Sequence, residues 1–494
     1  MRTATITVVC LMVAALFVAS SSSLPGMEAA LEQTGGSPLP AADEITVTVT
    51  DVRALESDIP SSLSVTVDIN GETLSSPTWD DSSCYGLGWQ ATVPVPADVE
   101  TVPVTLRLWA HDADGDICCD IGGSDDAVAS GNGRSAMLQY SRMTGDWTGD
   151  DYRGDESGYG RLNGCDDGSI YTSEHDCEVW FSITGGDADG DGLTDWEETN
   201  RYGTDPAVSD AGSDTDGDGV SIEWEDRWGY DPFTAERHAT LDPDNDSLSN
   251  LEEYRMRAWQ ADPYRPDLFI ELDQMAVQPN DSVGYVTDGT RELLTTVYNR
   301  RNLVYHLDDG CMDGGEIIPY DGLTGPGELT DIYHAFFLNN GSSAWRRGVF
   351  HYGVIINRHF LVDGHAFPGD GSILDFDEGG VNCFQISRQP LAGKMLRPTR
   401  EKIDFYYACL IMHETGHTLG IYAGHPPGCD NQFSKYPWQL GSYIFRNYRS
   451  VMNYRYTYHL LDYSDGTHGK RDYDDWGNLD LGYFEHRPAI DGLM

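Results

Sequence analysis

The sequence contains few basic residues and very little lysine. Lysine and arginine together number 31 among 494 residues, only four of them lysine, against 81 aspartates and glutamates, which gives a net charge of −50. Because phosphate binding needs a basic surface, this charge excludes nucleic acid as a partner. Scarce lysine with abundant aspartate also suits a high-salt habitat, where screening weakens the repulsion between like charges.

Long hydrophobic runs are absent except at the N-terminus. There, residues 6–19 are apolar, follow Arg2 and precede the small-residue run ASSSSLPG, but they are too few to span a bilayer. This pattern predicts a secretory signal over residues 1–23, with a membrane anchor as the alternative, and a linker over residues 24–43. We therefore expect a secreted protein, free or attached to the cell surface, with no transmembrane segment after signal removal. The sequence does not indicate its oligomeric state.

Cysteine pairs with the CxxC spacing of zinc sites are also absent. Cys10 lies in the predicted signal, and nine cysteines remain after it. Export permits disulfides, and an odd count leaves at least one thiol free or paired with another chain. Cys165 and Cys177, which bracket a short polar segment, are predicted to form a disulfide.

The chain is too long for one domain, and its texture changes twice. Over residues 44–184, apolar and polar residues alternate in short runs such as EITVTVTDV and VPVTLRLWAH, which predicts a β-sandwich. An acidic loop in this region resembles the calcium-binding loops of C2-like domains, with a solvated acidic loop as the alternative. Its acidic residues are Asp112, Asp114, Asp116, Asp120, Asp125 and Asp126.

Residues 185–262 contain an internal repeat. The segments DADGDGLTDWEE, DTDGDGVSIEWE and DPDNDSLSNLEE start at Asp187, Asp214 and Asp242 and are named loops 1, 2 and 3 here. Each has aspartate at positions 1, 3 and 5 and glutamate at position 12, an oxygen set that suits Ca²⁺. Position 6, which makes a sharp turn, is glycine in loops 1 and 2 but Ser247 in loop 3. The predicted calcium ligands are Asp187, Asp189, Asp191 and Glu198; Asp214, Asp216, Asp218 and Glu225; and Asp242, Asp244, Asp246 and Glu253.

A helix is expected after each loop but not before it, unlike in true EF-hands. The phrases YGTDP and WGYDP between the loops resemble thrombospondin type 3-like repeats of secreted microbial proteins. The alternative is an acidic linker that binds no metal.

Residues 263–494 have the texture of a mixed α/β domain. DLFIELDQM, NLVYHLDD and FHYGVIINRHFLV are predicted strands, and RELLTTVYNRR is a predicted helix. The predicted helix IDFYYACLIMHETGHTLG carries the sequence HExxH. On a helix, His413 and His417 project from one face and can bind one zinc ion, while Glu414 beside them suits a general base. Gly420 follows where such a helix must end and turn back.

HExxHxxG followed by SVMNY resembles the metzincin zinc endopeptidases, and the phrases around it resemble a group of secreted bacterial and archaeal zinc proteases. The resemblance covers about residues 266–484. It implies a metzincin-like α+β catalytic domain, with His413 and His417 as zinc ligands, Glu414 as general base and Met452 beneath the metal. It also places Tyr454 near zinc, where its phenol would stabilise an oxyanion; a core aromatic is the alternative.

The third zinc ligand departs from the family pattern. HExxHxxGxxH requires histidine at position 423, which is Ala423 in this chain. His425 is the preferred third ligand and Asp430 the alternative, because a carboxylate is also an acceptable zinc ligand. His351, His359 and His365 have no matching spacing and are expected to be core or surface residues.

Together these patterns predict a secreted multidomain zinc endopeptidase that acts on proteins or peptides and is stabilised by calcium. The alternative is a calcium-dependent surface or adhesion protein with an inactive protease-like domain, which Ala423 favours.

Overall fold

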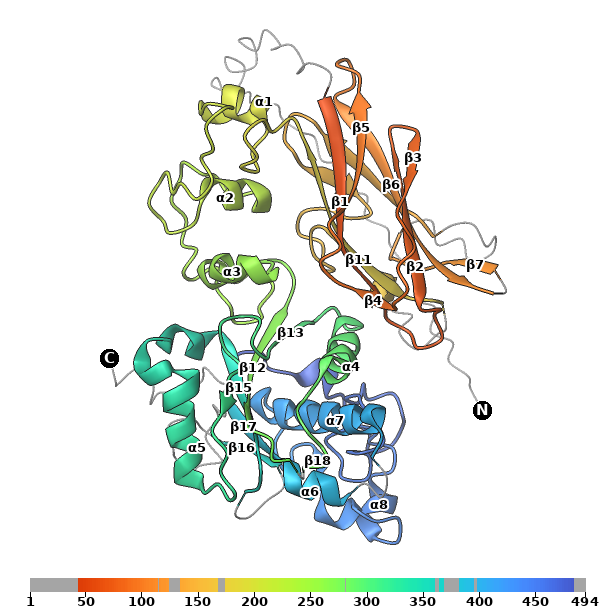
Figure 1. Ribbon diagram of the computed structural model, residues 1–494, viewed down its shortest axis with the longest axis vertical. Coiled ribbons are helices and arrows are strands. Elements are labelled where there is room, and N and C mark those ends of the chain that lie inside the picture. The colour runs from red at the N-terminus through yellow and green to blue at the C-terminus, as the bar shows by residue number, and fades with distance from the viewer. Residues whose placement is uncertain are drawn as a thin grey trace, which may run out of the picture. The chain divides into compact units, whose positions relative to one another are not determined.

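The chain is mixed α/β, with several β-sheets and few helices (Figure 1). The computed structural model describes residues 43–113, 115–123, 134–167, 174–279, 281–359, 364–367, 382–394 and 398–483. The predicted signal peptide and nearly all of the linker lie outside these residues, as do Asp114, Asp125 and Asp126 of the acidic loop. In the described part, no helix combines the length and the apolar character that crossing a membrane requires.

The N-terminal region contains two antiparallel sheets around one hydrophobic core, as the alternating pattern predicts. Inward residues such as Val47, Val65 and Leu106 are fully buried, while their neighbours along each strand are more exposed. The first sheet has the order β10-β11-β1-β4, with β5 also beside β1; the second has the order β3-β2-β6-β8-β9, with β7 beside β6. The elements are β1 (Asp43–Ala54), β2 (Ser62–Ile69), β3 (Glu72–Ser75), β4 (Ser83–Cys84), β5 (Trp89–Val95), β6 (Thr101–Asp112), β7 (Gly115–Cys118), β8 (Ala136–Ser141), β9 (Trp147–Gly149), β10 (Arg161–Asn163), η1 (Gly164–Asp167) and β11 (Cys177–Gly185).

The predicted disulfide between Cys165 and Cys177 is wrong. Both thiols are free, and each contacts a different neighbour. Cys165, on the short turn η1, points its Sγ at Asp176 Oδ2, 3.5 Å away. Cys177 begins β11, where its side chain enters the sandwich core beside Cys119. The two cysteines, although close in sequence, therefore lie on different elements with different surroundings.

A short helix begins at position 9 of each of loops 1 to 3, slightly earlier than the expected helix after each loop. The helices are α1 (Asp195–Glu197), which continues as η2 (Glu198–Tyr202), α2 (Ile222–Trp228), and α3 (Asn250–Met256), which continues as η3 (Arg257–Trp259). Thr194 and Ser249 start the first and third of these helices with capping boxes. The glutamate at position 12 of each loop thus lies on a helix and is held by it.

The C-terminal region is built on a sheet of order β13-β12-β15-β17-β16, with β14 also beside β12. All pairs are parallel except β16 with β17. Every residue of β12 is buried, because α4 and α7 cover one face of the sheet and α5 with η4 covers the other. The elements are β12 (Asp267–Met275), α4 (Asp288–Asn299), β13 (Val304–Asp308), β14 (Ile317–Ile318), α5 (Pro326–Ile332), η4 (Tyr333–Phe337), η5 (Asn339–Gly341), η6 (Ala344–Gly348), β15 (Phe350–Ile356), β16 (Gly364–Phe367), β17 (Cys383–Ser387), α6 (Arg388–Gly393), α7 (Arg400–Thr418), β18 (Pro427–Asp430), η7 (Gln432–Ser434), α8 (Leu440–Ile444) and η8 (Trp476–Asn478).

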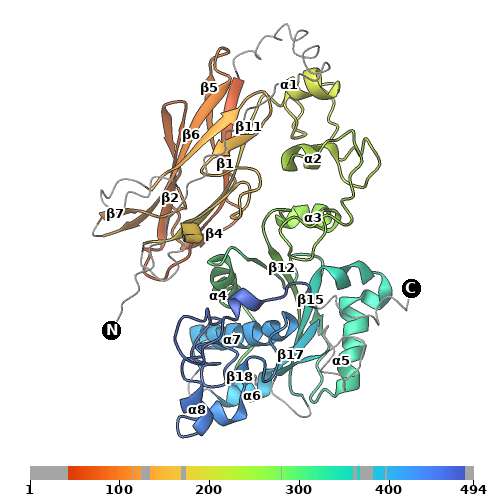
Figure 2. The same cartoon turned by 180° about the vertical axis from the view of Figure 1, so that it is seen from behind.

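The predicted strand that begins at Phe350 lies inside the sheet and not at its edge. This segment forms β15, which pairs with β12 on one side and β17 on the other. The edge strand is β16, and in the described residues it pairs with β17 alone. Both views show α7 running alongside β15 and β17 (Figure 2). The helix that carries HExxH therefore packs close to a sheet edge where, among the described residues, no further strand pairs.

A buried arginine joins two strands of this sheet. Arg346 is 2% exposed, and its Nε and Nη2 each lie 2.5 Å from a carboxylate oxygen, of Glu271 on β12 and Asp308 on β13. Arg346→Met should lower the free energy of unfolding by about 3–5 kcal/mol, because it leaves two buried carboxylates without a counter-charge. Urea unfolding in saturating calcium measures this, with the exposed Arg446→Met as control; equal stabilities would contradict it.

Candidate metal centre

The histidines of HExxH lie on the buried helix α7. Thr399 starts this helix by accepting the N–H of Lys402 on its side chain, and nearly every residue from Tyr407 to Thr418 is buried. His413 and His417 are one turn apart, with ring centroids separated by 5.0 Å. A helix fixed on all sides holds their imidazoles in one orientation.

The end of α7 determines how His417 is oriented. Gly420 has a φ of +90°, the left-handed conformation that glycine adopts without strain, and it turns the chain back. The N–H of Ile421 then donates to the carbonyl of Gly416 at 2.9 Å, and the carbonyl of Ile421 accepts from His417 Nδ1 at 2.6 Å. The turn expected at Gly420 is present, and because Nδ1 is used in this bond, Nε2 is the ring nitrogen left to face Asp430.

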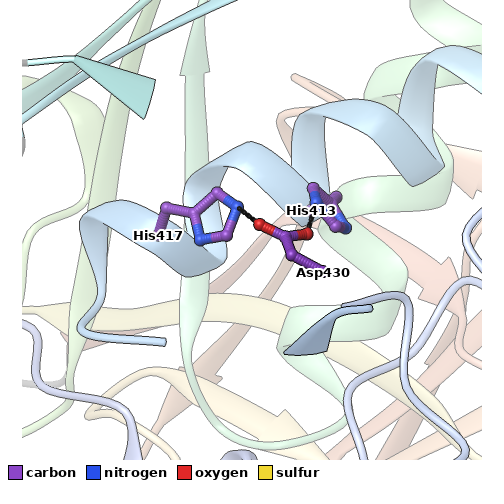
Figure 3. Close-up of side chains that lie close together, drawn as sticks. All are labelled: His413, His417 and Asp430. Atoms are coloured by element: carbon purple, nitrogen blue, oxygen red, sulfur yellow. Dashed lines mark ion pairs between the residues drawn. The ribbon is translucent and has the colours of Figure 1, made fainter. Parts of the chain in front are cut away.

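Asp430 lies between the two histidines (Figure 3). Its Oδ1 is 3.0 Å from His413 Nε2, and its Oδ2 is 3.3 Å from His417 Nε2. Asp430 ends β18 with a φ of +53°, and its backbone N–H donates to the carbonyl of Met452 at 3.1 Å. That bond ties the carboxylate to the segment SVMNY.

The three side chains suit a zinc ion. His413 Nδ1 lies 2.9 Å from the carbonyl of Val451, as His417 Nδ1 does from Ile421, so both rings can donate through Nδ1 and present an Nε2 lone pair. Zinc bonds of about 2.0–2.2 Å at tetrahedral angles place neighbouring ligand atoms roughly 3.3 Å apart. The measured separations of 3.0 and 3.3 Å agree with this value.

The charges around Asp430 also favour a cation. Burial alone would raise the pKa of Asp430, but His417 and His413 hold it well below its usual range. Burial lowers the pKa of His417, but Asp430 outweighs this effect and raises it to about 9. When protonated, the two rings share this one carboxylate, and a divalent ion would replace their Nε2 protons.

Glu414 is buried beside the histidines and is not part of their cluster. It is 4% exposed, its Oε2 has no hydrogen-bond partner among the described residues, and burial raises its pKa to about 7. Its Oε1 faces Gly364 on β16, where an added Cβ would lie 2.4 Å from that oxygen. The backbone of the edge strand therefore approaches the carboxylate so closely that a larger residue at position 364 would displace it.

Met452 and Tyr454 lie on the segment that faces α7. Met452 is fully buried, and a Cβ added at Gly416 would lie 2.7 Å from its sulfur, so it packs directly beneath the turn between the two histidines. The ring of Tyr454 stacks on His413 with centroids 5.8 Å apart, and its hydroxyl interacts with Asp430. Burial and Asp430 together raise the pKa of Tyr454 above its usual value, so its hydroxyl stays protonated.

His425 is placed differently from the other predicted zinc ligands. It is exposed on the turn after α7, where its ring packs on Tyr422 with centroids 4.9 Å apart. The cluster of converging ligand atoms comprises His413, His417 and Asp430. The structure therefore brings together the two helix histidines and the alternative third ligand.

Sequence spacing gave no signal for His365, which lies on β16 close enough to His417 for their charges to interact. Burial, His359 and His417 lower the pKa of His365 to about 4, so its ring is neutral. Its Nδ1 is 2.9 Å from Gln385 Nε2. His365 therefore adds a neutral polar group to the wall of the site.

The three acidic loops share one geometry. In loops 1 and 2 the first aspartate accepts two or more loop N–H groups, including the N–H of the glycine at position 6. In loop 3, Ser247 takes the same left-handed conformation, with a φ of +77°, and donates its N–H to Asp242. The replacement of glycine therefore keeps the turn at the cost of some backbone strain.

The carboxylates of these loops are buried near one another. Glu198, Glu225 and Glu253 are all fully buried, and neither carboxylate oxygen of Glu225 or Glu253 makes a hydrogen bond within the described chain. Burial and neighbouring aspartates raise the pKa of Glu198 to about 7 and that of Glu225 to about 8. A bound divalent cation would remove this repulsion and supply the missing partner.

Loop 3 is joined to the start of the C-terminal sheet. Asp246 Oδ2 accepts the backbone N–H of Asp267, the first residue of β12, at 2.8 Å. Glu253→Gln should therefore reduce the stability that excess calcium confers by roughly 2–3 kcal/mol, the effect of losing one well-occupied site. Thermal unfolding across a calcium titration measures this, with the exposed Glu72→Gln as control. Identical calcium responses would contradict a site in loop 3.

Comparisons with known proteins find little similarity. No protein-family model and no curated protein match the chain. Human GIVD cytosolic phospholipase A2 in complex with methyl gamma-linolenyl fluorophosphonate matches 29% of this chain and 17% of that chain, with 14% identity and a TM-score of 0.17. The structure of a C2 domain matches 29% of this chain and 97% of that chain, with 12% identity and a TM-score of 0.18. At such scores, neither likeness carries an argument about this chain.

Proposed function

We propose that the chain is a secreted, zinc-dependent endopeptidase of the metzincin type. The observation that carries the proposal is the convergence of His413, His417 and Asp430 beside a buried glutamate, Glu414. Asp430 takes the place in the ligand set that Ala423 cannot fill, which weakens the case for an inactive adhesion protein. The position of Met452 beneath the histidines adds support from a separate segment.

The residues of the site have separate roles in peptide hydrolysis. A bound zinc ion would lower the pKa of a coordinated water toward neutrality and polarise the scissile carbonyl. Glu414 Oε2 accepts a proton from the attacking water and passes it to the nitrogen of the leaving amine. The protonated hydroxyl of Tyr454 donates a hydrogen bond to the oxyanion. The carbonyls of Val451 and Ile421 keep both imidazoles oriented throughout.

The edge strand β16 suits an extended peptide. The side on which no described strand pairs can bind a substrate strand, which aligns the peptide backbone along the site without reading its side chains. Gly364, on this strand, lies against Glu414, so a paired peptide would pass directly beside the general base. Protein and peptide substrates fit this arrangement.

The segment after Asp430 offers an apolar surface to such substrates. Phe433, Trp438, Leu440 and Tyr443 are between 67% and 80% exposed. Soluble proteins rarely gather large apolar side chains in one exposed segment unless it binds something. We assign this surface to apolar side chains of the substrate.

Gly364→Ala should lower kcat/KM about 100-fold. The new methyl group would lie 2.4 Å from Glu414 Oε1 and would push the carboxylate out of its position. Zinc content should not change, since Glu414 is outside the ligand cluster. Peptide hydrolysis and metal analysis measure the two quantities, with Gly393→Ala as control because a Cβ there meets nothing within 4 Å. Equal activity of both variants would contradict the close approach.

The decisive experiment uses the purified full chain and an unfolded protein substrate. We expect cleavage by the wild type, its loss when zinc is removed by a chelator with calcium kept in excess, and its return with one equivalent of zinc. Failure of the zinc-loaded protein to cleave any unfolded protein would refute the proposal and leave the calcium-dependent adhesion protein as the remaining candidate.

A further inference from the structure

A histidine from a later part of the chain lies against the carboxylates of loop 2. His238 is fully buried, with its ring set edge-on against Trp224 and Tyr230 at centroid distances of 5.5 and 4.8 Å. Its Nε2 is directed at three carboxylates, those of Asp218, Glu225 and Glu236, at distances of 3.3, 3.9 and 3.9 Å. Asp218 and Glu225 are positions 5 and 12 of loop 2, and Glu236 lies outside the loop.

These atoms have the arrangement of ligands around one ion. Metal bonds of about 2.0–2.3 Å place neighbouring ligand atoms roughly 3–4 Å apart, which matches the three distances. A charged imidazole that merely neutralised the acids would donate a hydrogen bond from Nε2. His238 Nε2 makes none among the described residues, and neither do the oxygens of Glu225 and Oε2 of Glu236.

Asn250 can orient the imidazole for metal binding. His238 Nδ1 lies 3.2 Å from Asn250 Nδ2, and Asn250 Oδ1 has no hydrogen-bond partner within the described chain. The two orientations of an amide are equal in shape. With Oδ1 turned toward Nδ1, the amide accepts the Nδ1 proton, and Nε2 keeps its lone pair for a metal. This is the usual support of a metal-binding histidine.

Loops 1 and 3 have no histidine at the equivalent sequence position. In every loop the aspartate at position 5 accepts a backbone N–H from a later acidic residue, which is Asp210, Glu236 or Asp267 in turn. His238 stands two residues after Glu236, and the equivalent positions of the other loops hold Gly212 and Phe269. The nitrogen ligand is therefore specific to loop 2.

We propose that loop 2 is a site for a divalent transition-metal ion, bound by His238 Nε2 together with the carboxylates of Asp218, Glu225 and Glu236. Imidazole favours ions of the zinc class, whereas an all-oxygen shell such as that of loops 1 and 3 favours Ca²⁺. This second metal site is structural, and it does not depend on the chain being a peptidase.

The test uses the full chain with zinc as the probe and calcium in excess. Metal analysis after equilibrium dialysis should show one zinc fewer in His238→Gln than in wild type, with at least a tenfold lower affinity at that site, while His425→Gln keeps the wild-type content. Loss of the zinc at His413 and His417 would not change this difference, so the two zinc proposals fail separately.

A crystal of the wild-type protein grown with both metals decides the matter even where His238→Gln does not fold. An anomalous zinc peak within about 2.1 Å of His238 Nε2 is expected. Calcium at that position, or no zinc there, would overturn the proposal and leave His238 as a neighbour of an ordinary calcium loop.

Discussion

Glu414→Gln is expected to lower kcat for peptide hydrolysis by about 10²–10⁴ while the protein keeps its zinc and its fold. Glutamine has nearly the same shape as glutamate but cannot accept and return a proton. Glu414 is 4% exposed, its Oε2 lacks a hydrogen-bond partner in the described structure, and it stands outside the cluster of His413, His417 and Asp430. Steady-state assays on a fluorogenic peptide give kcat, and metal analysis gives the zinc content.

The matched control is Glu401→Gln, an exposed glutamate in the first turn of the same helix, which should keep full activity. A Glu414→Gln variant that hydrolyses peptide at the wild-type rate would show that the measured activity does not come from this site. A variant that also loses zinc would show that Glu414 is a ligand rather than a base.

Asp430→Ala is expected to weaken zinc binding by at least about 100-fold and to remove activity at limiting zinc, because it deletes a direct ligand. His425→Ala should change neither quantity, since that side chain is exposed and packs on Tyr422. Competition with a zinc chelator of known affinity measures the two constants. This pair decides between the two third ligands that the sequence allowed.

Loss of the Asp430 carboxylate also leaves His413 and His417 without their common partner, so the stability of the apo protein should fall as well. The zinc-affinity comparison is therefore made under conditions where both variants are folded, as shown by circular dichroism. Zinc retained by Asp430→Ala and lost by His425→Ala would reverse the assignment.

Much of the fold was predictable because it depends on local patterns. The strands β1, β2, β5 and β6 follow the alternation of apolar and polar residues, and α4 and α7 follow the helical periodicity. The helix at the end of each of loops 1 to 3 and the turn at Gly420 were also predictable, since caps and left-handed glycines act within a few residues.

Other features depend on contacts between distant segments. The choice of β16 rather than β15 as the edge follows from how the parallel strands order themselves around β12 and β17. Cys165 and Cys177 are close in sequence, but they do not bond because Cys177 enters the sandwich core. No spacing along the chain contains this information.

For the candidate site, the sequence by itself determined the pair His413 and His417, the neighbouring Glu414, and the acidic positions of the three loops, because each set lies within a dozen residues and its geometry is that of one helix or one turn. Only the tertiary structure placed Asp430, Gly364 and His238. Each of these residues comes from a separate segment. The backbone bond to Met452 positions Asp430, the pairing of β16 with β17 positions Gly364, and packing on Trp224 positions His238. Such positions are decided by the packing of whole elements, which sequence spacing does not encode.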